Sequence, residues 1–391
     1  MARVTVLAQY YYPAFKAGGP VPGVRNALRA LNSHAVHVYT SDRDLGDRTP
    51  FPAPHVGTIS VDNATVTYLP DFAIRTPRAW LLAAKRLLSG DAVYVNSLFS
   101  TWYSIFPLIL MHVLRFRGVV AIAPRGELAE SALHLGRTPL KRMWLSLLRR
   151  FAMYRSIGTK GNVVWLASSD HERADVARAF PGARVYLSPE TLREPPPATL
   201  VTRKRGARDE LQVVCVGRVS PVKGIIELVD GLAHVTGRVH LRLIGPAEDA
   251  AYVARVRAAE AVLPDTVRVS WLGALPTDVV MRYLQTADLA VLLSHGENFG
   301  HAIGEALMVG CPVLISDQTP WSFVAKENAG VALSSRECHD PLLVARAIED
   351  FAALSASALG AMREAAQRCG EAGLVLPGTV DLAQALGLAE R

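Results

Sequence analysis

The fold of this chain is decided by the stretch Leu289-Ala-Val-Leu-Leu-Ser-His-Gly-Glu-Asn-Phe-Gly-His-Ala-Ile-Gly-Glu-Ala-Leu-Met-Val-Gly-Cys-Pro-Val-Leu-Ile-Ser316. Its apolar run 289–293 predicts a buried strand, residues 299–309 predict a helix, and 313–315 predict a second strand. A strand-helix-strand unit of this kind belongs to a parallel sheet, where ligands bind at the carboxyl ends of the strands. We therefore expect the polar loop 294–298 to bind a ligand.

The start of the predicted helix is suited to an anionic ligand. Its first backbone N–H groups, at about 298–301, have no partner within the helix, and Gly300 has no side chain to keep a ligand away. Two carboxylates, Glu297 and Glu305, flank this position, and carboxylates accept hydrogen bonds from the hydroxyls of a sugar or a ribose. The simpler alternative is a Glu favoured by the helix dipole together with an ordinary solvated Glu.

The residues around these carboxylates favour the functional interpretation. Glu297-Asn-Phe-Gly-His-Ala-Ile-Gly-Glu305, followed by Ala306-Leu-Met-Val-Gly-Cys-Pro-Val313, resembles the E-x7-E signature of family 4 glycosyltransferases (glycosyl transferases group 1), which are retaining and use nucleotide sugars. The resemblance implies the GT-B fold, an α/β architecture of two Rossmann-like, doubly wound parallel-sheet domains that face a cleft. It also implies a catalytic role for Glu297 and donor contacts for Glu305, Asn298, Phe299 and Gly300.

A second motif opens the C-terminal half. In Leu211-Gln-Val-Val-Cys-Val-Gly-Arg-Val-Ser-Pro-Val-Lys-Gly224 a predicted strand is followed by Gly217, Arg218 and Lys223. The motif resembles the family's second signature, whose Arg and Lys hold the donor diphosphate. Two cations at the end of a strand neutralise the charge that builds on a departing diphosphate. We therefore expect Arg218 and Lys223 to be catalytic, the alternative being surface cations beside a turn.

Two further loops are donor candidates. Ala17-Gly-Gly-Pro-Val-Pro-Gly23 lacks the G-x-G-x-x-G spacing but looks like the family's glycine-rich loop, so Gly18 and Gly19 are predicted to contact donor phosphate or acceptor. The turn 271–274 resembles the family's base-binding turn, which makes Leu272 and Gly273 candidates for nucleobase contact.

The sequence departs from the family at one position. Many members place a His beside the reacting sugar, where this chain has Ala123-Pro-Arg-Gly-Glu127. Whether Arg125 or Glu127 replaces that His is left open. Asp42-Arg-Asp44 is formally a D-x-D metal motif, but it follows a predicted strand in a polar loop, so we expect neither a metal site nor a cofactor.

Length and composition indicate two domains. The chain has 391 residues, half of them apolar and a fifth charged, which fits parallel sheets covered on both faces. We predict an N-terminal domain at 1–190, a Pro-rich linker at 191–210 and a donor-binding domain at 211–375. A last helix at about 376–391 is expected to return to the first domain. Four scattered cysteines favour a reducing compartment.

Alternating apolar runs predict the remaining elements. Strands are expected at 3–9, 36–40, 64–68, 92–95, 119–123, 163–167, 239–244 and 267–273, with helices between them. The apolar segment 102–114 is too short to span a membrane and is predicted to be a buried helix.

The net charge of +7 and pI near 9.3 indicate an anionic partner. No nucleic-acid motif accompanies the charge, so nucleic acid is not expected. Residues at about 138–155 are predicted to form a basic amphipathic helix, which either lies on an anionic membrane surface or packs in the core with a solvated basic face. The sequence therefore predicts a cytoplasmic protein that lies peripherally at the inner face of the membrane if the first alternative holds.

Together these features predict a metal-independent, retaining hexosyltransferase. Its donor would be GDP-mannose or a UDP-sugar and its acceptor a glycan or a lipid-linked sugar, in bacterial surface or exopolysaccharide synthesis. The alternatives are a GT-B sugar-nucleotide epimerase, which needs no acceptor, and a non-catalytic module that only binds the nucleotide sugar.

Overall fold

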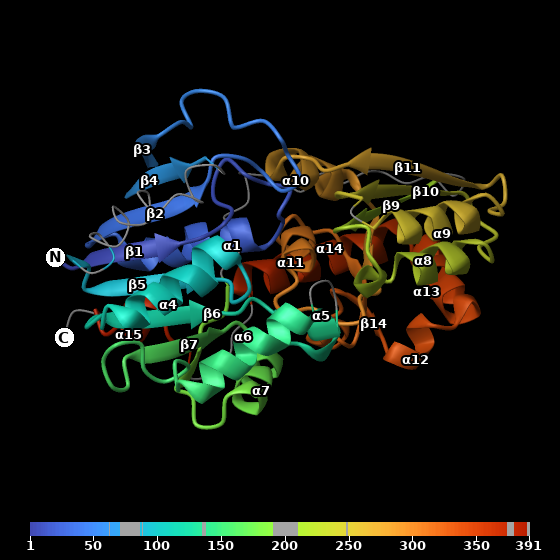
Figure 1. The fold of residues 1–391 in the computed structure, drawn as a ribbon. Coiled ribbons are helices and arrows are strands. Elements are labelled where there is room, and N and C mark those ends of the chain that lie inside the picture. The colour runs from blue at the N-terminus through green and yellow to red at the C-terminus, as the bar shows by residue number, and fades with distance from the viewer. Residues whose placement is uncertain are drawn as a thin grey trace. The chain divides into compact units, whose positions relative to one another are not determined.

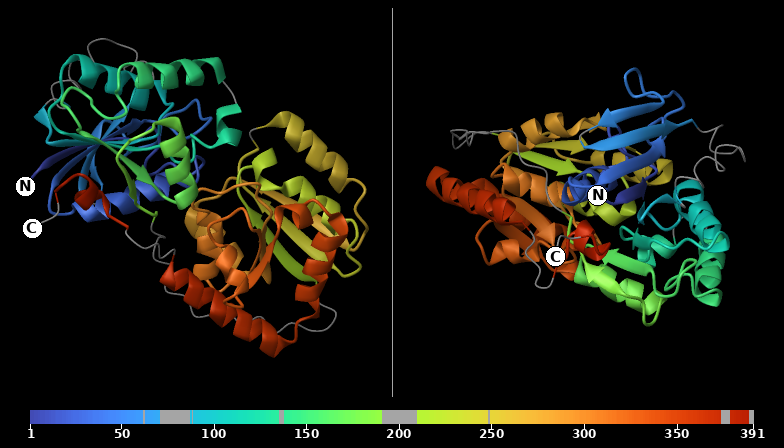
Figure 2. Two further views of the ribbon diagram at one scale, coloured as in Figure 1. Left: turned by 90° about the horizontal axis from the view of Figure 1, so that it is seen from below. Right: turned by 90° about the vertical axis from the view of Figure 1, so that its left-hand side faces the viewer.

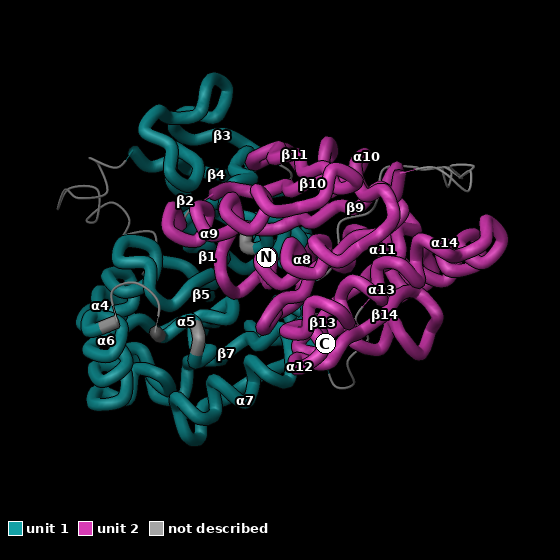
Figure 3. The backbone as a smooth tube through the Cα atoms, turned by 90° about the vertical axis from the view of Figure 1, so that its right-hand side faces the viewer, with its two compact units in different colours: residues 1–191, 376–391 teal, residues 192–375 magenta. Residues whose placement is uncertain are grey.

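The protein divides into two compact units. In the computed structural model, unit 1 comprises Met1–Thr191 and Leu376–Arg391, and unit 2 comprises Leu192–Val375 (Figure 3). The structure describes residues 1–61, 63–70, 87, 89–134, 138–190, 210–247, 249–373 and 379–388. The predicted linker therefore lies outside the described residues, apart from Glu210.

Unit 1 is built on an eight-stranded sheet with the order β3-β4-β2-β1-β5-β6-β7-β8. Strand β3 pairs antiparallel with β4, and the other strands are parallel. The elements, with helices on both faces of the sheet (Figure 1), are β1 (Arg3–Leu7), α1 (Pro20–Ala27), β2 (Ala35–Ser41), β3 (Thr58–Val61), β4 (Ala64–Leu69), β5 (Ala92–Asn96), α4 (Phe106–Val113), β6 (Val119–Ala123), α5 (Glu130–His134), α6 (Thr138–Arg150), β7 (Val163–Ala167), α7 (Asp170–Ala179), β8 (Val185–Leu187) and α15 (Leu382–Ala385).

The central strands of unit 1 form because their side chains are apolar on both faces. All five residues of β5 and of β7 are buried, which is the pattern of a parallel sheet covered twice. Helix α1 and the C-terminal α15 pack on one face, where Leu382 and Leu386 join the same core as Val6 and Leu31. Helices α4, α6 and α7 pack on the other face.

Unit 2 is built on a six-stranded, fully parallel sheet with the order β11-β10-β9-β12-β13-β14. Its elements are β9 (Leu211–Val216), α8 (Ile225–Leu232), β10 (Val239–Ile244), α9 (Ala250–Glu260), β11 (Val267–Gly273), α10 (Thr277–Thr286), β12 (Leu289–Leu292), α11 (His301–Met308), β13 (Val313–Ser316), β14 (Gly330–Leu333), α12 (Ser335–Cys338), α13 (Pro341–Ala353) and α14 (Ala356–Ala372).

Helices also cover both faces of this second sheet. Helices α8, α9 and α13 pack on one face, and α10, α11 and α14 pack on the other. Side-chain caps fix several helix starts: Asp249 accepts from the Tyr252 N–H, and Ser334 forms a capping box with Glu337. The predicted fold class, two α/β units with doubly wound parallel sheets, is confirmed.

Two features differ from the sequence prediction. The short strands β3, β8 and β14 were not predicted, because none carries a long apolar run. The segment 102–114 is not a uniformly buried helix: it begins as a π-helical turn at Thr101–Ile105, and Val113 is 68% exposed on α4. Within the described residues, no helix is long and apolar enough to cross a membrane.

Candidate functional site

The strand order of unit 2 locates its ligand-binding edge. The chain runs outward from β9 through β10 to β11 and then returns to the other side of β9 with β12. The loops after β9 and β12 therefore diverge at the carboxyl edge, which is where open α/β sheets bind ligands. These two loops contain Gly217, Arg218 and Lys223 on one side and residues 294–300 on the other.

A partly buried ion pair joins the two loops. The Nζ atom of Lys223 donates to Oε1 of Glu297, and the Ser294 hydroxyl donates to the same oxygen at 2.9 Å. The side chains of Lys223 and Glu297 are only 19% and 10% exposed. The structure thus brings together two residues that lie 74 positions apart and that the sequence predicted to be catalytic.

Glycines let these loops approach each other. Gly224 has φ +60°, and a Cβ there would lie 2.0 Å from the carbonyl oxygen of Leu293. At the neighbouring strand end, a Cβ on Gly245 would lie 1.9 Å from the carbonyl oxygen of Gly217. The backbone is therefore packed too closely for any other residue at these two positions.

Helix α11 starts where the sequence predicted an anion-binding position. Gly300, its N-cap, has φ +78°, and the preceding carbonyl of Phe299 accepts from the indole N–H of Trp321 at 2.7 Å. Phe299 and Gly300 are buried, whereas Asn298 and Glu305 are partly exposed. Phe299 and Trp321 therefore support the turn from within the core.

The remaining predicted donor residues of unit 2 lie at the same edge of the sheet. Arg218 is exposed directly after β9. Leu272 and Gly273 end β11, and the Gly273 carbonyl accepts from the Gly245 N–H at 2.8 Å. Neighbouring Trp271 has a structural explanation, because its indole donates to Glu260 at 2.9 Å and Arg257 lies 4.0 Å above its ring.

The switch point of unit 1 lies between β1 and β5. The predicted Gly18 and Gly19 belong to the loop after β1, where Gly18 has φ +71° and Gly19 is the N-cap of α1. This loop is joined to the loop after β5 by Ser100, whose hydroxyl donates to the Gln9 side chain at 2.9 Å.

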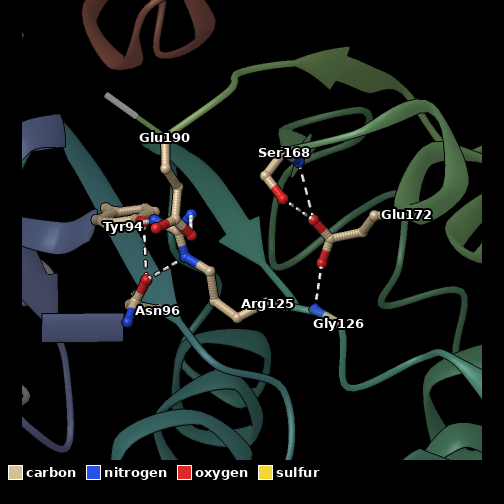
Figure 4. A network of polar contacts seen from close by, with 7 residues as sticks. All are labelled: Tyr94, Asn96, Arg125, Gly126, Ser168, Glu172 and Glu190. Carbon is tan, nitrogen blue, oxygen red and sulfur yellow. Dashed lines mark hydrogen bonds and ion pairs between the residues drawn. The ribbon is translucent and has the colours of Figure 1, made fainter. Parts of the chain in front are cut away.

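A polar network that the sequence did not predict surrounds Arg125 (Figure 4). The guanidinium donates to Asn96 Oδ1 at 2.7 Å, to the Tyr94 hydroxyl at 2.6 Å and to Glu190. Burial by itself lowers the pKa of Arg125, but the charge of Glu190 and the other acidic neighbours raises that pKa above its ordinary value. Arg125 is therefore a fixed positive charge at the carboxyl edge of the sheet.

The other partners of this network come from successive strand ends. Glu172, in the first turn of α7, accepts from the Gly126 N–H at 2.6 Å and from the backbone and hydroxyl of Ser168 at 2.8 and 2.9 Å. A Cβ on Gly23 would lie 2.4 Å from Oε2 of Glu190. In the sequence, members of this network such as Ser168 directly follow apolar strands. That pattern could have indicated them, but they are too far apart along the chain to be recognised as one network.

Glu127, the other residue at the departure from the family, has a different environment. It accepts from the backbone N–H groups of Leu98 and Phe99 and from the Ser97 hydroxyl. Burial raises its pKa, and these hydrogen bonds offset the rise in part. Glu127 thus fastens the loop after β6 to the loop after β5.

The D-x-D triplet belongs to the loops of unit 1. Asp42 accepts from Arg43 Nε at 2.8 Å, and Asp44 accepts from the backbone N–H groups of Phe15 and Lys16 at 2.8 and 3.0 Å. Asp44 therefore supports the glycine-rich loop after β1.

Comparison with known proteins agrees with this geometry. Residues 201–373 match the family model described as Glycosyl transferases group 1. A search of curated proteins finds no match.

Several solved structures resemble the whole chain. Sucrose-phosphate synthase from Thermosynechococcus elongatus is 20% identical, with 99% of this chain and 97% of that chain covered and a TM-score of 0.69. Anabaena HepE, solved with UDP and glucose, is 18% identical, with 96% of each chain covered and a TM-score of 0.67. A UDP-forming α,α-trehalose-phosphate synthase from Burkholderia vietnamiensis is 12% identical, with 95% and 96% covered and a TM-score of 0.61. The chain therefore has the GT-B fold, and its residues 201–373 match the group 1 glycosyltransferase model.

Proposed function

We propose that this protein is a retaining hexosyltransferase that takes a hexose from a nucleotide diphosphate sugar. The observation that carries the proposal is the Lys223–Glu297 pair, which joins the two motif-bearing loops at the switch point of a group 1 glycosyltransferase domain. Open α/β sheets bind ligands at this edge, so the pair lies where a donor diphosphate would be bound.

In this proposal each site residue acts on a different part of the donor. Lys223 and the exposed Arg218 bind the diphosphate and stabilise the negative charge that grows on it as the sugar–phosphate bond breaks. Glu305 accepts from the ribose hydroxyls. Glu297 holds Lys223 in place before the donor arrives and contacts the sugar in the complex. The departing phosphate takes the proton of the acceptor hydroxyl on the same face of the sugar.

Glu305→Ala tests the donor site. The variant removes the acceptor for the ribose hydroxyls, so its donor affinity should fall by about 1–3 kcal/mol. Calorimetric titration with UDP-glucose is the first measurement, because HepE was solved with UDP and glucose. Glu364→Ala, an exposed glutamate on α14, is the matched control. The same titration is carried out with GDP-mannose. Unchanged donor affinity in a folded Glu305→Ala variant would refute the assignment of Glu305 to the ribose.

We further propose that transfer requires no divalent ion. Asp42 and Asp44 are engaged by Arg43 and by the backbone of the glycine-rich loop, which leaves the diphosphate charge to Arg218 and Lys223. Transfer should therefore continue in excess EDTA. Abolition by EDTA with rescue by Mn²⁺, and loss of that rescue in Asp44→Asn, would contradict this point.

For the acceptor, we propose a glycan or lipid-linked sugar of bacterial surface or exopolysaccharide synthesis, met at an anionic membrane. Helices α4 and α6 lie side by side (Figure 2), with the rings of His112 and Phe151 6.4 Å apart. The α4–α6 surface exposes large apolar side chains, with exposed fractions between 39% and 68%: Ile109, Val113, Leu114, Leu140, Met143 and Phe151.

Basic residues accompany these apolar side chains. Arg115, Arg117, Arg142 and Arg150 are exposed on the same two helices or directly after them. Trp144 and Leu148 lie on the other side of α6 and pack in the core. The helix therefore has apolar residues both on its buried face and on its exposed face. An exposed apolar patch with cationic neighbours matches the chemistry of an anionic lipid surface.

Vesicle binding tests the α4–α6 surface. The wild type should co-sediment with vesicles that contain phosphatidylglycerol, and less so as salt rises, because salt screens the arginines. Arg142→Glu with Arg150→Glu should weaken binding, whereas the same charge change on unit 2, Arg336→Glu with Arg346→Glu, should have a smaller effect. Arg149 is left intact, since it donates to the Ala179 carbonyl at 2.7 Å. No co-sedimentation at low salt would contradict the proposal.

A further inference from the structure

We propose that Glu227, His295 and His339 form a binding site for a divalent transition-metal ion such as zinc. The three residues come from different elements of unit 2: α8, the loop after β12, and the residue that follows α12. One potential ligand atom from each lies within 4.8 Å of the others. This inference goes beyond the transferase activity, because none of these residues has a role in the proposed reaction.

The distances are close to those that a metal ion imposes. The Nε2 atom of His295 lies 2.8 Å from Glu227 Oε1, and Nε2 of His339 lies 3.9 Å from the same oxygen. Ligands at about 2.0–2.1 Å from a tetrahedral zinc ion are roughly 3.3–3.5 Å apart. Small side-chain rotations would therefore bring all three atoms into the first coordination sphere.

The hydrogen bond of His339 fixes the ring for coordination. Its Nδ1 lies 2.7 Å from the Ser335 carbonyl oxygen, which can only accept, so Nδ1 carries the proton and Nε2 presents its lone pair. A backbone carbonyl is one of the partners that orient metal-bound histidines. His295 Nε2 lies 2.8 Å from Glu227 Oε1, and His295 would ligate an ion through Nε2 as the tautomer that carries its proton on Nδ1.

The second oxygen of the Glu227 carboxylate is also uncompensated. Oε2 of Glu227 is buried and has no hydrogen-bond partner among the residues that the structure describes. The Glu227 side chain is 17% exposed, so its carboxylate lies largely out of water. A bound cation would offset that cost.

The donor set determines the class of metal. Two imidazoles and one carboxylate are ligands of zinc and other transition metals, whereas Mg²⁺ and Ca²⁺ take oxygen ligands. The accessibility of the site agrees, because the side chains of His295 and His339 are 37% and 54% exposed and an ion can enter from solvent.

Occupancy would fasten the donor-site loops. His295 lies two residues before Glu297, and Glu227 lies in the first turn of α8, which follows Lys223. An ion held by both residues would tie the loop after β12 to α8 and to α12. It would restrain the elements that carry the Lys223–Glu297 pair without taking part in the chemistry.

The test is calorimetric titration of the full chain, stripped of metal, with zinc alone. The wild type should bind one zinc ion, and His295→Ala, His339→Ala and Glu227→Gln should each weaken binding by roughly tenfold or more, as loss of even an outer-shell partner does at other sites. His234→Ala, an exposed histidine at the end of α8, is the matched control and should bind like the wild type.

Zinc should also raise the thermal unfolding temperature of the wild type and of His234→Ala but not of His339→Ala. Zinc affinity that is equal in the wild type and in the three ligand variants would overturn the proposal, as would tight binding of Mg²⁺ in place of zinc. Because the titration contains no nucleotide sugar, its outcome is independent of the proposed transferase activity.

Discussion

Gly224 is the residue at which the donor site depends most directly on backbone geometry. Its φ of +60° and the Leu293 carbonyl oxygen, 2.0 Å from any added Cβ, both exclude a side chain. Gly224→Ala should therefore lower the free energy of unfolding by about 2 kcal/mol or more. Gly237→Ala, with nothing within 4 Å of the added Cβ, is the control in urea denaturation. Equal stabilities of the two variants would contradict the account.

Lys223 and Arg218 determine how the proposed reaction responds to mutation. Charge on the leaving phosphate is greatest in the transition state, so Lys223→Met and Arg218→Ala should each reduce kcat more than they raise the donor KM. Steady-state kinetics with a varied donor separates the two effects. Variants that only raise KM would show that both cations bind substrate and transition state equally.

At the scale of elements, Glu127 fastens the loop after β6 to the loop after β5, and the stability that it contributes depends on pH. Burial raises its pKa above the ordinary value of 4.5, so the folded protein holds the proton to higher pH than the unfolded chain does. The contribution of Glu127 to stability is therefore largest below pH 4.5 and is lost as the pH rises through the folded-state pKa.

Glu127→Gln removes this titration. The stability of the wild type relative to the variant should fall as pH increases from 4.5, measured by chemical denaturation at a series of pH values. A difference that stays constant, or that grows in favour of the wild type, would show that Glu127 is not held in its protonated form by burial.

The Arg125 network connects the ends of β5, β6 and β8. Its ion pair with Glu190 is nearly buried, with side chains 11% and 6% exposed. Arg125→Ala leaves Glu190 unpaired and should destabilise unit 1 by about 3–5 kcal/mol. Arg173→Ala breaks the Arg173–Asp170 pair, 52% and 55% exposed, and should cost less than about 1 kcal/mol. Similar unfolding curves for the two variants would refute the buried role of Arg125.

Elements with continuous apolar runs could be predicted from the sequence. Strands β6 and β7 have the predicted ends, because burial on both faces leaves a clear run of apolar residues. The Arg125 network could not be predicted in the same way. Tyr94, Arg125 and Glu190 become neighbours only through the strand order, and no local spacing encodes that order.

At the scale of the whole molecule, the two sequence motifs predicted more of the architecture than the spacing of apolar residues did. The E-x7-E segment and the Arg218–Lys223 motif anticipated a two-unit α/β chain, and the strand order of unit 2 places both motifs at its switch point. The roles of the individual site residues remain predictions. These roles involve contacts with a nucleotide sugar, and the sequence indicates such contacts only through its resemblance to the family.

The most direct test of the central claim is nucleotide release. The full chain is incubated with a panel of nucleotide sugars that includes UDP-glucose and GDP-mannose, and free nucleoside diphosphate is followed over time. We predict slow release from at least one donor by the wild type, and markedly slower release by Lys223→Met at saturating donor. Tight donor binding without any release would instead indicate a non-catalytic binding module, and release with an epimerised sugar would indicate an epimerase; either result would contradict the proposed transfer.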